Sequence, residues 1–312
     1  MTSISTPPGG SNEDDGSVGI AVACANVLGE GALWSAEEHA LYWVDIERAE
    51  LWRFVPEDAA AETPPPEPRT WRRPERIAAA TPRRDGGSLI VALATGIAAF
   101  DPATGQIERL ADVEARSPHT RLNDARCDRQ GRFLVGGHVE HGPALTALYR
   151  FDHDLTVTAV LAGISTANSI CFAPDGRTLY FADSPRREIL AYDYDPATGA
   201  VGGGRVFCRL GEHEPGVPDG STVDAEGYLW NARWGGACLA RYAPDGTLDR
   251  IVRLPVSQPT CPAFGGDDLG TLYVTSARQG LSAERLAAEP AAGSVLRIRP
   301  GVRGLPEMPF AG

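Results

Sequence analysis

A short apolar segment occurs six times along the chain at nearly constant spacing, and this repeat constrains the fold more than any other feature. Successive copies begin 43 to 50 residues apart, an interval typical of propeller blades that each contain four strands. Short apolar runs bounded by Asp-Gly, Gly-Gly and Pro-Asp-Gly turns fill the intervals, whereas helical periodicity is weak. We therefore expect an all-β, six-bladed β-propeller with four antiparallel strands per blade. The six copies are Leu41–Asp45, Leu89–Leu93, Phe133–Gly137, Leu179–Asp183, Leu229–Arg233 and Leu272–Ser276.

The extent of the repeat favours a single propeller domain over residues 19–312, preceded by a flexible tail of residues 1–18. The last blade contains only three strand-like segments, because an insert around residues 280–290 takes up much of its length. Residues 19–27 can supply the missing strand, so we expect an N-terminal strand to close the ring and remove an exposed sheet edge. The acidic, proline-rich segment 56–68 interrupts the first blade and is predicted to be a surface excursion without chemistry.

Charge and composition argue against several classes of partner. The formal net charge of −12 disfavours nucleic acid, and no apolar run approaches the roughly 20 residues needed to cross a bilayer. The N-terminal residues contain neither the basic nor the apolar region of a secretory signal, and the six cysteines form no Cys-x-x-Cys pair. We expect a cytoplasmic protein with reduced thiols that binds neither nucleic acid nor membranes and exists as a monomer or weak homodimer.

Oxygen-bearing side chains precede four of the six repeated segments by ten or eleven residues. The innermost strand of every propeller blade lines one central channel, so equivalent positions in different blades converge in space. Taken singly, each residue is compatible with a turn or a structural acceptor, but their shared position in the repeat favours a common site. Two carboxylates and an amide oxygen suit a hard divalent cation, and no histidine or thiolate pair points to zinc. The residues at this position are Glu30, Ala78, Asn123, Asn168, Asp219 and Cys261.

Arg121 lies two residues before Asn123, so on a strand both side chains face the same side. Arg121 therefore suits an anionic or oxygen-rich ligand in the channel, although a loop arginine paired with a surface carboxylate is the ordinary alternative. His138 and His141 flank the end of the third repeated segment, as rim residues or as exposed loop histidines. The chain contains no Gly-x-Ser-x-Gly elbow, His-Glu-x-x-His motif or Walker loop, so a serine-hydrolase mechanism has no support.

Four motifs together resemble the gluconolactonase/regucalcin (senescence marker protein) family, and the similarity extends over residues 19–300. This resemblance implies a six-bladed propeller with one divalent cation (calcium, zinc, manganese, magnesium or iron(II)) held by Glu30, Asn168 and Asp219. It also implies that Arg121 and Asn123 contact a sugar lactone. Two further segments, residues 227–236 and 275–282, are more similar to bacterial aldonolactonases. The four motifs are Leu28–Trp34, Arg121–Asp124, Ala167–Ser169 and Pro218–Trp230.

The chain departs from the family pattern at the rim, where some members place an acidic residue near the substrate and this sequence offers Glu140 or His141. The expected activity is metal-dependent hydrolysis of a pentono- or hexonolactone to the aldonic acid. Either Asp219 or a hydroxide on the cation would serve as the base. The alternatives are a non-catalytic divalent-metal-binding or interaction propeller, and a metal-dependent esterase or organophosphate hydrolase.

Overall fold

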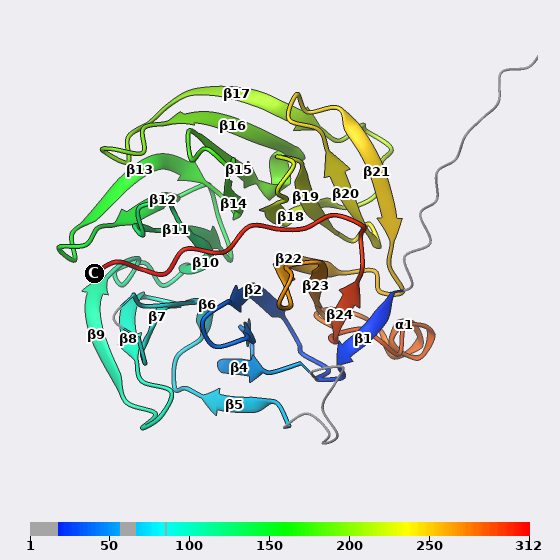
Figure 1. Cartoon of the computed structure of the whole chain (residues 1–312), viewed down its shortest axis with the longest axis horizontal. Coiled ribbons are helices and arrows are strands. Elements are labelled where there is room, and N and C mark those ends of the chain that lie inside the picture. Colours follow the sequence, from blue (N-terminus) through cyan, green and yellow to red (C-terminus); the bar gives the residue numbers. More distant parts are fainter. Residues whose placement is uncertain (1–17, 57–66, 85) are drawn as a thin grey trace, which may run out of the picture.

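The computed structural model describes residues 18–56, 67–84 and 86–312, which form six four-stranded antiparallel sheets arranged around a central axis (Figure 1). The predicted six-bladed, all-β propeller is therefore confirmed. Residues 1–17 of the expected N-terminal tail lie outside the described residues, as do residues 57–66 of the predicted surface excursion. The described ends of that segment, residues 56 and 67–68, lie between the third and fourth strands of the first blade.

Five of the blades are each formed by four consecutive strands, which are numbered outward from the central axis. Their strands are β2 (Gly29–Ser35), β3 (Ala40–Asp45), β4 (Glu50–Phe54) and β5 (Arg69–Arg72) in the first blade; β6 (Ile77–Pro82), β7 (Leu89–Leu93), β8 (Gly96–Phe100) and β9 (Ile107–Asp112) in the second; β10 (Thr120–Cys127), β11 (Phe133–Val139), β12 (Thr146–Phe151) and β13 (Val157–Ile164) in the third; β14 (Ala167–Phe172), β15 (Thr178–Asp183), β16 (Glu188–Tyr194) and β17 (Val201–Arg209) in the fourth; and β18 (Val217–Val223), β19 (Leu229–Trp234), β20 (Cys238–Tyr242) and β21 (Leu248–Arg253) in the fifth.

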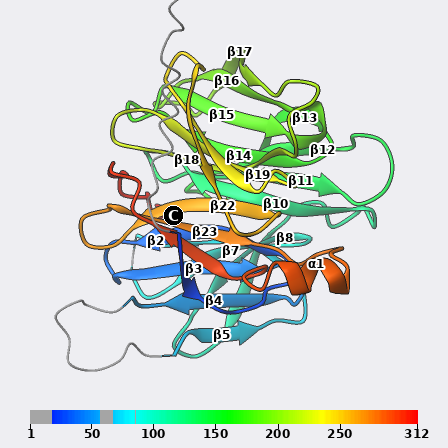
Figure 2. The same cartoon turned by 90° about the vertical axis from the view of Figure 1, so that its right-hand side faces the viewer.

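The sixth blade combines strands from both ends of the sequence. From the centre outward it contains β22 (Pro259–Gly265), β23 (Thr271–Ser276), β24 (Val295–Ile298) and β1 (Gly19–Val22). β1 pairs antiparallel with β24, so an N-terminal strand joins the last blade, although ring closure by this strand stays a prediction. The insert between β23 and β24 contains α1 (Ala283–Ala288) (Figure 2). A 3-10 turn, η1 (Ser184–Arg186), follows β15.

The repeated apolar segment of the sequence is the second strand of each blade. β7, β19 and β23 illustrate why it is apolar almost throughout, since these strands are buried over nearly their whole length between adjacent blades. Hydrophobic side chains pack across each gap between blades, as Tyr42 and Leu51 of the first blade do with Val91 and Phe100 of the second. The six cysteines are free, and no helix in the described part of the chain is long and apolar enough to cross a membrane.

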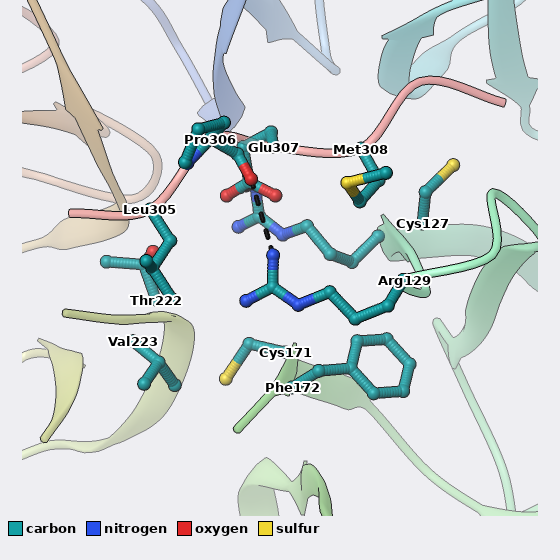
Figure 3. A pocket seen from close by; sticks show the side chains of 11 residues that line it. Cys127, Arg129, Cys171, Phe172, Thr222, Val223, Leu305, Pro306, Glu307 and Met308 are labelled. Carbon is teal, nitrogen blue, oxygen red and sulfur yellow. Dashed lines mark hydrogen bonds and ion pairs between the residues drawn. The ribbon is translucent and has the colours of Figure 1, made fainter. Parts of the chain in front are cut away.

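The C-terminal residues 299–312 cross the face of the ring on which the innermost strands end (Figure 1). In close view, Leu305–Met308 lie over Arg129 and Phe172 (Figure 3). The carboxylate of Glu307 accepts a hydrogen bond from the buried guanidinium of Arg126 at 3.0 Å. This C-terminal segment covers one end of the channel, so a ligand would enter from the face on which the innermost strands begin.

Candidate active site

Each of the six innermost strands contains a bulge or irregularity near its beginning, where pairing with the second strand shifts register. A bulge adds a residue to one strand and thereby re-aims the neighbouring side chains. All six residues that share one position in the sequence repeat lie at these irregularities. Four oxygen-bearing side chains consequently occupy one structural position in four different blades, namely Glu30, Asn123, Asn168 and Asp219.

The side-chain amide of Asn123 joins two residues that the sequence analysis predicted separately. Its Oδ1 accepts a hydrogen bond from Nη1 of Arg121 at 2.6 Å, and its Nδ2 donates to Oδ1 of Asn168 at 3.2 Å. Nδ2 of Asn168 in turn donates to Oγ of Ser184 at 2.8 Å. All four side chains are buried. Two of the predicted substrate residues, Arg121 and Asn123, and one predicted metal ligand, Asn168, therefore belong to a single network across the third and fourth blades.

The backbone around Asp219 is fixed by side chains to which sequence reasoning assigned no role. Its carbonyl oxygen accepts hydrogen bonds from Oγ of Ser169 at 2.6 Å and Nδ2 of Asn231 at 3.0 Å, while Ser184 donates to the carbonyl of Pro218 at 2.6 Å. Ser169 has a φ of 58°, a left-handed conformation that costs a non-glycine residue about 1–2 kcal/mol. The one sequence signal for Ser169 was its place directly after Asn168, in the motif Ala167–Ser169. Asn231 lies in one of the repeated segments, Leu229–Arg233, but its contact with Asp219 was not predicted.

Buried carboxylates from three blades lie within electrostatic reach of one another. Burial and the nearby Asp124 raise the pKa of Glu30 to about 8, and burial and Glu30 raise the pKa of Asp219 well above its usual range. Asp124, which was not predicted, accepts a hydrogen bond from the backbone N–H of Ile170 at 2.9 Å, and burial raises its pKa to about 6. Burial and mutual repulsion make the ionised forms costly unless a positive charge lies between these groups.

The donor set fits a hard divalent cation. Glu30 and Asp219 supply two carboxylates that would balance a 2+ charge, and Oδ1 of Asn168 retains acceptor capacity beyond its bond from Asn123. The described residues contain no group of three or more histidine, cysteine, aspartate or glutamate side chains that could hold a metal ion. A cation here would thus depend on the amide oxygen of Asn168 as its third protein ligand.

The rim of the site combines arginine and carboxylate side chains. Arg121 is buried, and its pKa is lowered to about 10 by burial and by the nearby guanidinium of Arg76. Glu140, a predicted substrate residue, forms an ion pair with Arg76 at 2.6 Å, a contact that the sequence did not reveal. His138 contacts Thr166 at 3.0 Å, and burial and Arg121 lower its pKa to about 4. His141 is exposed in the loop after β11, and its predicted contact with the substrate stays a prediction.

Comparison with known proteins relates the whole propeller to one family. Residues 28–278 match the family described as the SMP-30/Gluconolactonase/LRE-like region. The L-arabinolactonase of Azospirillum brasilense is 45% identical over 92% of this chain and 93% of its own. The 6-deoxy-6-sulfogluconolactonase of Pseudomonas putida is 36% identical over 92% of this chain and 96% of its own.

A solved structure supports the same relationship. The calcium-binding protein regucalcin from Agrobacterium tumefaciens superimposes with a TM-score of 0.87 and 31% identity, covering 94% of this chain and 97% of its own. Sequence and structure thus agree over nearly the full length of the propeller. The chain belongs to the SMP-30/gluconolactonase/LRE-like family.

Proposed function

We propose that this protein hydrolyses a sugar aldono-lactone, a pentono- or hexonolactone, to the corresponding aldonic acid with the help of one divalent cation. The observation that carries the proposal is the network of Arg121, Asn123 and Asn168 beside the buried carboxylates of Glu30 and Asp219. A cation site needs no arginine beside it, whereas a polyhydroxylated lactone needs donors that orient its ring. The names of two relatives, an L-arabinolactonase and a sulfogluconolactonase, support the same substrate class.

Glu30, Asn168 and Asp219 would hold the cation. When bound, a divalent cation polarises a lactone carbonyl and stabilises the negative charge that develops on its oxygen during hydrolysis. The calcium-binding description of the regucalcin structure supports a divalent cation, and oxygen ligands also admit zinc, manganese, magnesium and iron(II).

Side chains of the protein would bind the substrate and transfer the proton. Nη1 of Arg121 and the amide of Asn123 would bind the hydroxyl and ring oxygens of the lactone, and their mutual hydrogen bond fixes their relative position. The carboxylate of Asp219, whose backbone is held by Ser169 and Asn231, would accept a proton from the attacking water. Holding the lactone and the attacking water in the reactive geometry contributes substantially to hydrolysis, and no covalent intermediate is required.

The test is initial-rate hydrolysis of a panel of aldono-1,4- and 1,5-lactones, followed by proton release. The protein is first treated with a chelator, and single divalent metals are then added back. Turnover that is lost on chelation and restored by one metal would support the proposal and identify both cation and sugar. Tight metal binding without turnover of any lactone would contradict it.

That second outcome would favour a non-catalytic metal-binding propeller, a candidate supported by the calcium-binding description of the regucalcin structure. The metal-binding function and the lactonase function predict different effects of replacing Arg121. A metal-binding protein would retain its function in the Arg121→Ala variant, whereas a lactonase would lose catalytic efficiency while its metal affinity stayed the same.

A further inference from the structure

Arg76 lies at the mouth of the site, in the loop that leads into β6 of the second blade. It forms ion pairs with one acidic side chain from the first blade and one from the third. Its Nη1 lies 2.6 Å from Oε1 of Glu140, in the loop after β11, and 3.5 Å from Oε1 of Glu47, in the turn between β3 and β4. The three side chains are each about one-third exposed. They come from three successive blades and meet on the face where the innermost strands begin.

This group of Arg76, Glu47 and Glu140 also faces Arg121. The guanidinium of Arg76 repels that of Arg121, while Glu47 and Glu140 attract it. The mouth therefore contains two arginines and two carboxylates, whose charges sum to zero. The adjacent His138 adds no charge near neutral pH, because its pKa is lowered to about 4 by burial and by Arg121.

We propose that Arg76 is a specificity-determining residue, which together with Glu47 and Glu140 keeps the mouth electrically neutral and thereby favours lactones without an anionic substituent. The inference rests on the proposed lactonase function. An unpaired arginine would attract a carboxylate or sulfonate on the distal end of a sugar, because charge-assisted hydrogen bonds to guanidinium are strong. Here Glu140 and Glu47 already form ion pairs with the guanidinium of Arg76, and their carboxylates also repel an incoming anion.

The distinction between neutral and anionic lactones is relevant to this family. The relative from Pseudomonas putida is named for a sulfonated gluconolactone, and the relative from Azospirillum brasilense is named for an uncharged pentonolactone. Charge at the mouth is a property that a few substitutions can change without altering the propeller or the cation ligands. The net charge of zero at the mouth of this chain is the value expected of a lactonase that acts on uncharged lactones.

The experiment compares D-glucono-1,4-lactone with D-glucaro-1,4-lactone, which differ only in a hydroxymethyl or carboxylate group at C6. The measured quantity is the ratio of kcat/KM for the anionic lactone to kcat/KM for the neutral one. Glu140→Gln leaves the mouth with a net positive charge and should raise this ratio by about five- to tenfold. Arg76→Met leaves a net negative charge and should lower the ratio by a similar factor.

Combining the two substitutions restores neutrality, so the double variant should return close to the wild-type ratio.

The matched control is Asp193→Asn. Asp193 is paired with Arg205 at 2.9 Å on the outer strands of the fourth blade, and its substitution changes the net charge of the protein by the same amount as Glu140→Gln. The control should leave the ratio unchanged. Raising the salt concentration should reduce the effects at Arg76 and Glu140, because ions screen charges at a solvent-exposed mouth.

Opposite shifts in Glu140→Gln and Arg76→Met would support the inference, since a general loss of structure would lower both rates without reversing the preference. An unchanged ratio, or a shift in the same direction in both variants, would overturn it while leaving the lactonase function intact. Failure of the wild-type protein to hydrolyse any lactone in the panel would instead overturn the proposed function, and the inference with it.

Discussion

Nδ2 of Asn123 donates a hydrogen bond to Oδ1 of Asn168 at 3.2 Å, and this bond connects residues 45 positions apart in the sequence. Asn168 is a proposed cation ligand, whereas Asn123 also accepts from Arg121 on the proposed substrate side. The two functions of the site are thus physically coupled through one amide group. Substitutions on either side of this bond should have distinguishable effects.

Asn123→Ala should weaken both cation binding and lactone turnover. Outer partners of metal ligands typically contribute 10- to 100-fold to metal affinity, so we expect a loss of about tenfold in affinity. Isothermal titration calorimetry with the restoring metal measures this loss, and initial rates measure kcat/KM. Unchanged metal affinity in a folded variant would contradict the coupling through Asn168.

Arg121→Ala should lower kcat/KM by about 10- to 100-fold, the range expected when a hydrogen bond to a charged group is lost. Metal affinity should not fall, because Arg121 is a cationic neighbour of the carboxylates of Glu30 and Asp219 and not a proposed ligand. The control is Arg205→Ala, which removes a guanidinium from the exposed outer strands of the fourth blade. Equal kinetics in the wild type and the Arg121 variant would remove the proposed role of this residue.

Asp219→Ala should lose both metal binding and activity, since it removes a proposed cation ligand and the proposed proton acceptor together. The variant should still fold, because Ser169 and Asn231 contact the backbone carbonyl of residue 219 rather than its carboxylate. Circular dichroism checks the fold, and calorimetry checks the metal. Full turnover by a folded, metal-free variant would refute the assignment.

In the chelated protein, stability should decrease as the pH rises from about 4.5 toward 8. The pKa of Glu30 is raised from 4.5 to about 8 by burial and by Asp124, so the folded state binds more protons than the unfolded state over this interval. The free energy of unfolding is therefore greatest below the unfolded pKa and falls as the pH rises toward the folded pKa, above which Glu30 is ionised in both states. Thermal unfolding in a chelator at several pH values measures the slope.

Glu30→Gln should flatten that pH dependence, because an amide does not ionise. Glu37→Gln, a substitution at an exposed glutamate, should leave it unchanged. Saturating metal should also raise the melting temperature of the wild type most at the upper end of the pH range, where the carboxylates are ionised. A metal-free protein whose stability rose between pH 4.5 and 8 would contradict this account of Glu30.

Glu307→Gln should destabilise the protein by about 3 kcal/mol, because it removes the ion-pair partner of the buried guanidinium of Arg126. The side chain of Arg126 is 4% exposed and that of Glu307 is 19% exposed. Asp267→Asn, which breaks an exposed contact with His39, should change stability by less than about 0.5 kcal/mol. Urea unfolding compares the two, and equal small effects would show that the C-terminal segment contributes little through this pair.

The repeat period, the turn residues and the apolar second strands determined the fold from the sequence alone. Those strands are buried between blades, so they are apolar almost throughout and recognisable without any tertiary information. The shared position of Glu30, Asn168 and Asp219 in the repeat was likewise visible, because a fixed position within a propeller blade translates into a fixed place along the channel.

Only the tertiary structure decided which other side chains complete the site. Asp124, Asn231 and Arg76 acquire their roles from neighbours on other strands or blades, and no local pattern marks those contacts. The irregularities in the innermost strands were equally hidden, although they determine the direction in which each side chain points. Periodicity along a chain encodes burial and strand order, whereas ion pairs and hydrogen bonds between distant segments depend on the geometry that folding creates.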